Sequence, residues 1–159
     1  MKQEFYSIAE LLAYTSSPTG KAGEGFCRVG PIPSGLAVQI QAATGLNVEG
    51  FELVLDQSGV RHTLEQHGLD NAASEIAQGQ VPIEDADFGA LASWLPTPDN
   101  VWAGEMRPGK LPMPCLEFQF RHPTGIVSAI LEFRPGRRRL VLTTMYKKRP
   151  AAEATDLTF

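Results

Sequence analysis

Two of the three histidines in the chain, His62 and His67, stand five residues apart in a segment that ends at Gly68. Imidazole exchanges protons readily near neutral pH, so the pair could supply a base and an acid to one reaction. On an ideal helix a spacing of five separates two side chains by about 140°. Either His67 therefore lies past the helix end and reaches back, or only one histidine belongs to a site. The structural alternative is an amphipathic helix with His67 near its C-terminus.

A second group of reactive side chains lies in the basic segment 137–149. Strand alternation predicts that one row of this segment points to the same side: Leu140, Leu142, Thr144, Tyr146 and Lys148. The hydroxyl and ammonium groups in such a row can bind a phosphate and stabilise developing charge. Guanidinium groups beside it also match phosphate geometry. The alternative is a solvated edge strand whose lysines protect against aggregation.

Neither histidine nor cysteine has the spacing of a metal site. The five-residue spacing differs from that of the HExxH zinc motif, and no third ligand can be identified. Cys27 and Cys115 lie far apart and belong to no CxxC pair. We therefore expect both cysteines to be core residues and expect no metal or cofactor.

The elements that must position these groups fall into a helical first part and a strand-rich second part. Helical spacing predicts helices over 5–14, 34–44, 60–68, 71–78 and 84–95. We expect Ser34 to cap the second of these and Gly45 to end it. Extended segments are expected over 26–29, 48–55, 101–102, 116–120, 126–133 and 140–146, with turns at 56–59, 122–125 and 135–136.

This order predicts an α+β protein with N-terminal helices packed on a C-terminal antiparallel β-meander. The length of 159 residues fits one domain, which we place over 1–150 with a flexible tail over 151–159. No apolar run is long enough for a membrane span, so we expect no membrane partner. The start lacks the layout of a secretory signal, which favours a cytoplasmic location, unless a larger protein or phage particle delivers the chain.

The net charge of −4 hides an uneven distribution. Residues 1–100 hold four basic and thirteen acidic side chains, whereas residues 101–159 hold ten basic and five acidic ones. The split indicates an anion-binding surface on the C-terminal part. Its alternative explanation is that two solvated surfaces partly neutralise each other.

Several segments, in this order, resemble the phage-associated nucleases of the barnase–EndoU–colicin–RelE class, which occur at the C-termini of phage head-morphogenesis-like proteins and polymorphic toxins. The resemblance covers 45–148 and departs from the class in the acidic first half and in the Pro-rich stretch 107–114. The matching segments are Gly50–Leu55, His62–Gly68, Pro82–Phe88 ("pit-eDf"), Leu95–Val101 ("P-D-x-V") and Leu142–Lys148 ("TMY-K").

The resemblance implies helices followed by an antiparallel sheet that binds RNA, and chemistry without a metal. In it a base takes the proton of the RNA 2′-OH, which attacks the adjacent phosphate, and an acid protonates the leaving 5′-oxygen. The catalytic residues would be His62, His67, Thr144, Tyr146 and Lys148. The residues that bind the RNA would be Arg137, Arg138, Arg139, Lys147 and Arg149.

Two functions of different classes follow. One is a metal-independent endoribonuclease, in a toxin with an immunity protein as partner or in a phage. The other is a non-catalytic binding or structural module that kept the fold. The overall acidity of the chain favours this module, because phosphate binding gains from positive charge.

Overall fold

Four strands near the end of the chain form the antiparallel meander that alternating residues predict. They are β5 (Asn100–Ala103), β6 (Cys115–His122), β7 (Gly125–Arg134) and β8 (Arg139–Lys148), and each pairs antiparallel with the next. A 3-10 helix, Pro135–Arg137, joins the last two. The computed structural model describes residues 3–16, 25–68, 80–81, 83–89, 91–104, 114–122 and 125–148.

The N-terminal part adds strands to the same sheet, so the sheet extends beyond the meander. These strands are β1 (Gln3–Phe5), β2 (Gly25–Pro31), β3 (Glu52–Asp56) and β4 (Gln80–Val81). The order across the sheet is β1-β2-β3-β8-β7-β6-β5, with β4 also paired to β8. The β3–β8 and β1–β2 pairs are parallel and the others are antiparallel. The expected mixture of helices and a mostly antiparallel sheet is therefore present.

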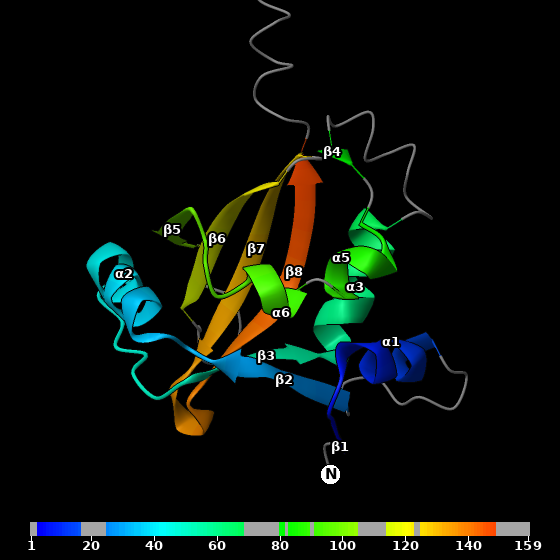
Figure 1. Ribbon diagram of the computed structural model, residues 1–159, viewed down its shortest axis with the longest axis horizontal. Helices are drawn as coiled ribbons and strands as arrows, with labels where there is room; N and C mark the ends of the chain where they lie inside the picture. Colours follow the sequence, from blue (N-terminus) through cyan, green and yellow to red (C-terminus); the bar gives the residue numbers. More distant parts are fainter. Residues whose placement is uncertain are drawn as a thin grey trace, which may run out of the picture.

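The helices gather at the two sides of this sheet and over its core face (Figure 1). They are α1 (Ile8–Ser16), α2 (Ser34–Thr44), α3 (Gln57–His67), α5 (Asp85–Gly89) and α6 (Leu91–Trp94). Helix α2 lies at one side, and α1, α3 and α5 lie at the other. Among the described residues, no helix is both long enough and apolar enough to cross a membrane.

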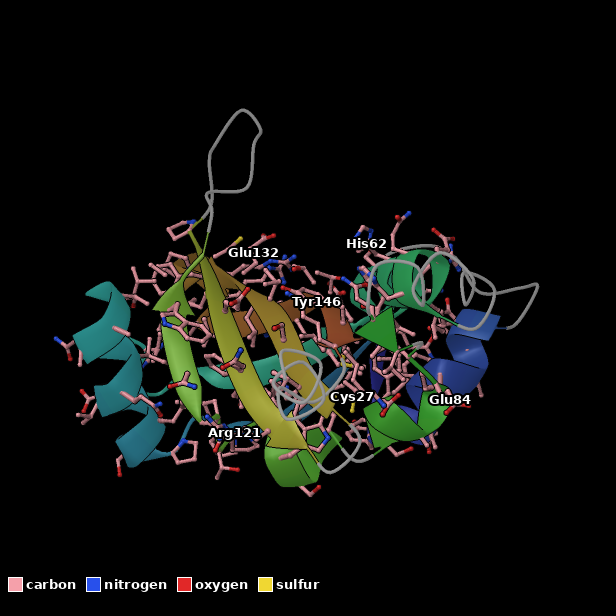
Figure 2. The ribbon with its side chains drawn as sticks, turned by 90° about the horizontal axis from the view of Figure 1, so that it is seen from above. Cys27, His62, Glu84, Arg121, Glu132 and Tyr146 are labelled. Carbon is pink, nitrogen blue, oxygen red and sulfur yellow. The ribbon has the colours of Figure 1, made fainter. Side chains whose placement is uncertain are left out.

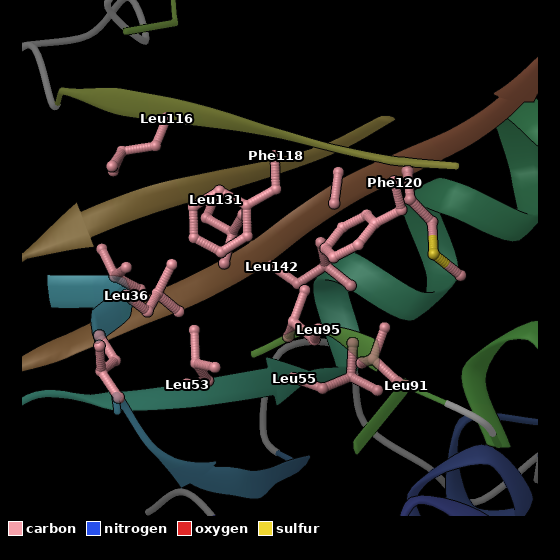
Figure 3. Packing of buried hydrophobic residues seen from close by; sticks show 14 of the residues in the cluster. Leu36, Leu53, Leu55, Leu91, Leu95, Leu116, Phe118, Phe120, Leu131 and Leu142 are labelled. Carbon is pink, nitrogen blue, oxygen red and sulfur yellow. The ribbon is translucent and has the colours of Figure 1, made fainter. Parts of the chain in front are cut away.

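The main hydrophobic core lies on one face of the sheet (Figure 3). Leucines of β3 and β8 pack there with the alternate residues Leu116, Phe118 and Phe120 of β6, and helices α2 and α6 contribute leucines from the other side. On the opposite face, which we call the second face, Phe26, Val54 and Val141 form a smaller buried cluster. The sheet therefore separates an apolar core from a mixed apolar and polar face.

Several predicted elements differ from the structure at their ends. Helix α3 begins inside the predicted turn 56–59, because Asp56 is its N-cap and accepts a hydrogen bond from Gly59 N at 2.7 Å. Helix α2 has Pro33 as its N-cap and no side-chain cap, so the expected role of Ser34 is wrong, whereas Gly45 ends the helix in the left-handed conformation. The helix predicted over 84–95 is divided into α5 and α6.

The helix predicted over 71–78 and the tail over 151–159 lie outside the described residues. Both cysteines are buried, as expected for core residues, and neither forms a disulfide within the described part of the chain. Burial, with Glu4 and Glu10 nearby, raises the pKa of the Cys27 thiol. A thiol that stays protonated at neutral pH is a poor nucleophile, which agrees with a core role for Cys27.

The strand alternation expected for β8 is wrong beyond Leu142. Leu131 of β7 pairs with Leu142 and Ile130 pairs with Thr144, so Thr143 is an extra residue, a β-bulge. Its hydroxyl donates to Ile130 O at 3.0 Å. Leu140 and Leu142 therefore share the core face with Met145, and Thr144, Tyr146 and Lys148 lie on the second face with Val141.

Helix α3 takes the place of a sheet neighbour along the middle of β8, between the residues that pair with β3 and the last two, which pair with β4. Strand β3 pairs with β8 only as far as Leu142, and α3 then follows the same edge. The backbone N–H of Met145 donates to the buried Thr63 Oγ1 at 3.2 Å, so a helix side chain supplies the acceptor that a strand would otherwise give. Gly59 lets the helix approach, because a Cβ there would overlap the carbonyl oxygen of Leu142.

We predict opposite effects for two Gly→Ala substitutions in helices. Gly59→Ala should destabilise the fold by about 1–3 kcal/mol, because the new methyl forces α3 away from β8. Gly35→Ala in α2 should stabilise it by up to about 1 kcal/mol, because no atom lies near its Cβ position and alanine favours helices. Denaturant unfolding measures both, and equal effects would contradict the close contact between α3 and β8.

Candidate functional site

The packing of α3 on β8 brings one of the two histidines to the sheet. Val60 and Thr63 are fully buried, and His67, the last residue of α3, follows at helical spacing. The ring of His67 lies 5.7 Å from the ring of Tyr146, centroid to centroid, at an interplanar angle of 40°. The backbone oxygen of His67 accepts from Ile83 N at 2.6 Å, which fixes the end of the helix.

Lys148 is on the same strand as Tyr146 and lies beside its ring. Its exposed side chain places Nζ 5.5 Å from the centre of the Tyr146 ring. Lys148 and Tyr146 are two residues apart on β8, so they share the second face. We call His67, Tyr146 and Lys148 the His67 cluster. It combines an imidazole, a phenol and an ammonium group.

Thr144, also predicted as catalytic, precedes this cluster on the same face of β8. Its Oγ1 atom is buried and has no hydrogen-bond partner among the described residues. A buried hydroxyl without a partner is unfavourable, so this group has hydrogen-bonding capacity for a ligand or water.

The other predicted histidine is placed differently. His62 is exposed at the surface of α3, whereas the residue after it, Thr63, is fully buried (Figure 2). The five-residue spacing thus has the effect expected on a helix, because the two imidazoles face different directions. His67 therefore contacts β8 through Tyr146, whereas His62 is exposed, and which of the two belongs to a site stays a prediction.

Lys147 was expected to bind RNA, but the bulge turns it toward the core face. Its Nζ donates to Asp87 Oδ1 of α5 at 3.0 Å, and only 7% of the side chain is exposed. This ammonium group is therefore neutralised inside the protein. Its neighbours Tyr146 and Lys148 point to the second face instead.

The predicted arginines lie at the opposite end of β8. Arg137 and Arg138 end the 3-10 turn, and Arg139 begins the strand that reaches Tyr146 seven residues later. Seven extended residues span about 20 Å, so these arginines do not contact the His67 cluster. Arg149 lies outside the described residues.

An acidic and basic group on the second face of β7 was not predicted from the sequence. Glu132 is only 6% exposed. Its Oε1 atom lies 2.9 Å from Arg134 Nε, and the Nη1 atom of the same arginine lies 3.9 Å from Asp56 Oδ2. Figure 2 shows Glu132 and Tyr146 on the same side of the sheet. The signal was the charged alternate residues in an otherwise apolar strand, which are seldom buried unless paired.

The cluster can transfer a proton and hold an anion. An imidazole can act as base or acid, a phenol can donate a hydrogen bond, and an exposed ammonium group can attract a phosphate. In the described part of the chain, no group of three or more His, Cys, Asp and Glu side chains is arranged to hold a metal ion. Comparison with protein-family models, curated proteins and solved structures gave no match.

We predict that Asp87→Ala is more harmful to stability than Lys147→Met. The first leaves a buried ammonium group without a partner, which costs about 3–5 kcal/mol. The second leaves a carboxylate that remains 20% exposed and can be hydrated, so its cost should be smaller. Lys148→Met is the matched control on the exposed side and should have little effect in denaturant unfolding. Equal losses for both lysine variants would contradict the placement of Lys147.

Proposed function

We propose that the protein is a metal-independent endoribonuclease with the His67 cluster as its catalytic centre. The observation that supports this best is the convergence of His67 and Tyr146, from distant parts of the sequence, beside Lys148. Each group has a role in cleavage by 2′-OH attack. The order of the segments that resemble the barnase–EndoU–colicin–RelE nucleases supports the same reaction, because His67, Tyr146 and Lys148 belong to two of those segments.

In the proposed reaction, His67 takes the proton from the RNA 2′-OH as the oxygen attacks the adjacent phosphorus. The bond from phosphorus to the 5′-oxygen breaks, and the Tyr146 hydroxyl donates a proton to that leaving oxygen. The products are a 2′,3′-cyclic phosphate and a free 5′-OH. Lys148 offsets the negative charge that develops on the phosphate oxygens. With one imidazole in the cluster, tyrosine takes the role first assigned to a second histidine.

A non-catalytic binding module of the same fold is the second candidate. Two observations favour it: the net charge of −4, and the burial of Lys147, which leaves Lys148 as the cation of the His67 cluster. Phosphate binding without further positive charge is weak and falls with salt. The two candidates differ in whether RNA is cut.

We predict that the purified protein cleaves RNA in the presence of a chelator and leaves DNA of the same sequence intact. RNA methylated on the attacking 2′-oxygen should also stay intact, and the products should end in 2′,3′-cyclic phosphate. His67→Ala should lower the cleavage rate by about 10²–10⁴-fold, the usual contribution of a general acid or base. His62→Ala is the matched control on the same helix and should retain nearly full activity.

Product analysis by gel electrophoresis and mass spectrometry distinguishes the candidates. Equal rate losses for both histidine variants would remove the special role of His67. An intact RNA substrate in every condition, together with tight binding of another protein, would favour the non-catalytic module.

A further inference from the structure

A second polar site lies at the opposite end of β8 from the His67 cluster. A pocket of about 240 Å³ opens there. The end of the 3-10 turn and the start of β8 form one side of it, and residues of β2 and β3 form the other. Four guanidinium groups and one carboxylate line it, so its net charge is positive. Its lining residues are Arg28, Gly50, Glu52, Arg137, Arg138 and Arg139. We call it the arginine pocket.

Three of the four arginines are held in place by other groups. Arg138 Nη2 donates to Glu49 O at 3.2 Å and lies over Gly50, where a Cβ would overlap it. Arg139 Cζ lies 4.7 Å from the centre of the Phe26 ring. Arg28 Nε lies 3.4 Å from Glu4 Oε1, and Arg28 Nη1 lies 3.4 Å from Glu52 Oε1. Side chains that are fixed in this way lose less entropy when they bind a ligand.

Positive charge remains after these contacts are counted. The ion pairs that the structure describes in this pocket both involve Arg28, which leaves the charges of Arg137, Arg138 and Arg139 uncompensated there. Arg137 and Arg138 are both exposed, so a ligand can reach the held guanidinium group of Arg138, and Arg137 can turn toward it. Guanidinium groups bind phosphate oxygens in pairs of parallel hydrogen bonds, so the ligand chemistry that fits best is a phosphate group.

The pocket is small and shares a sheet face with the His67 cluster. Its volume is below the range of about 300–1,000 Å³ for sites that enclose a drug-sized ligand, so it suits one phosphate group of a ligand that continues outside it. Arg139 pairs with Glu52 and precedes Val141 on the second face, which is also the face of Tyr146 and Lys148. A chain laid along this face of β8 would meet both sites, about 20 Å apart.

We propose that the arginine pocket is a phosphate subsite that holds the RNA strand several nucleotides away from the bond that is cleaved. For RNA as the ligand this inference rests on the proposed function, whereas the affinity for a phosphate group stands on the pocket alone. A single strand held at both ends of β8 gains affinity and a fixed register. A substrate too short to reach the pocket gains neither.

The test uses RNA methylated at every 2′-oxygen, which cannot be cut by 2′-OH attack, in a fluorescence anisotropy titration. One oligonucleotide has about 8 nucleotides, within the ~4–16 that small single-strand-binding folds cover, and the other is a dinucleotide. Arg137→Ala and Arg138→Gly each remove one guanidinium group, and glycine tolerates the positive φ of 55° at position 138. Arg61→Ala on α3 removes one charge outside the pocket as the control.

Each pocket variant should weaken binding of the longer strand about 10-fold or more, the loss that a charged hydrogen bond gives. The dependence of log affinity on log salt should become shallower by about 0.7–1 for each phosphate contact removed. Dinucleotide binding should not change, and Arg61→Ala should match the unmodified protein. Circular dichroism checks that both variants are folded.

Two outcomes would overturn the subsite: equal affinity of the longer strand for the pocket variants and the control, or competition by inorganic phosphate at the pocket without any binding of RNA. The second outcome would assign the pocket to a free phosphate. Loss of binding in the pocket variants supports the subsite even if the unmodified protein cuts no RNA, in which case the proposed nuclease fails separately. Cleavage of RNA with normal binding by both variants would leave the nuclease and remove the subsite.

Discussion

The hydrogen bond from Met145 N to Thr63 Oγ1 marks the contact on which the rest of the structure depends. A strand that loses its neighbour exposes backbone N–H groups that must find another acceptor if they are buried. Here a helix lies against the strand and supplies a hydroxyl. This contact requires glycine at position 59, where any larger residue would meet the Leu142 carbonyl. The end of α3, and His67 with it, is thereby fixed against β8.

The bulge at Thr143 divides β8 into two halves in which opposite alternate residues face the core. In the first half, Leu140 and Leu142 face the core, and in the second half Met145 and Lys147 do so. Without the extra residue, Tyr146 and Lys148 would point into the core and Lys147 would point away from it. The bulge therefore decides which of the two lysines is available to a ligand. Bulges are common next to functional sites for this reason, because they redirect side chains.

Much of the fold could be predicted because its signals are local. The alternation of Leu116, Phe118 and Phe120 identified β6, and the five-residue spacing of the histidines showed that they could not share a helix face. The association of His67 with Tyr146 is a long-range contact that the order of segments suggested. The parallel pairing of β3 with β8, by contrast, joins residues distant in sequence and has no local signal.

The remaining differences have physical causes that one sequence does not display. The bulge depends on how Ile130 and Thr143 meet across two strands, so alternation counted along β8 alone placed Lys147 on the wrong face. The burial of Lys147 needed a partner from α5, Asp87, which is sixty residues away. Likewise, the basic residues of 137–149 look like one patch in sequence, but an extended strand separates their ends.

Whether His67 meets a phosphate beside Tyr146 can be observed directly by NMR. The imidazole resonances of His62 and His67, assigned from the two alanine variants, are followed during titration with a ribonucleoside 3′-phosphate. If the His67 cluster binds the reacting phosphate, the His67 resonances and the ring protons of Tyr146 should shift together and saturate, while those of His62 stay in place. Equal shifts of both histidines, or no shift of His67 at saturating ligand, would contradict the assignment of the site to the end of β8.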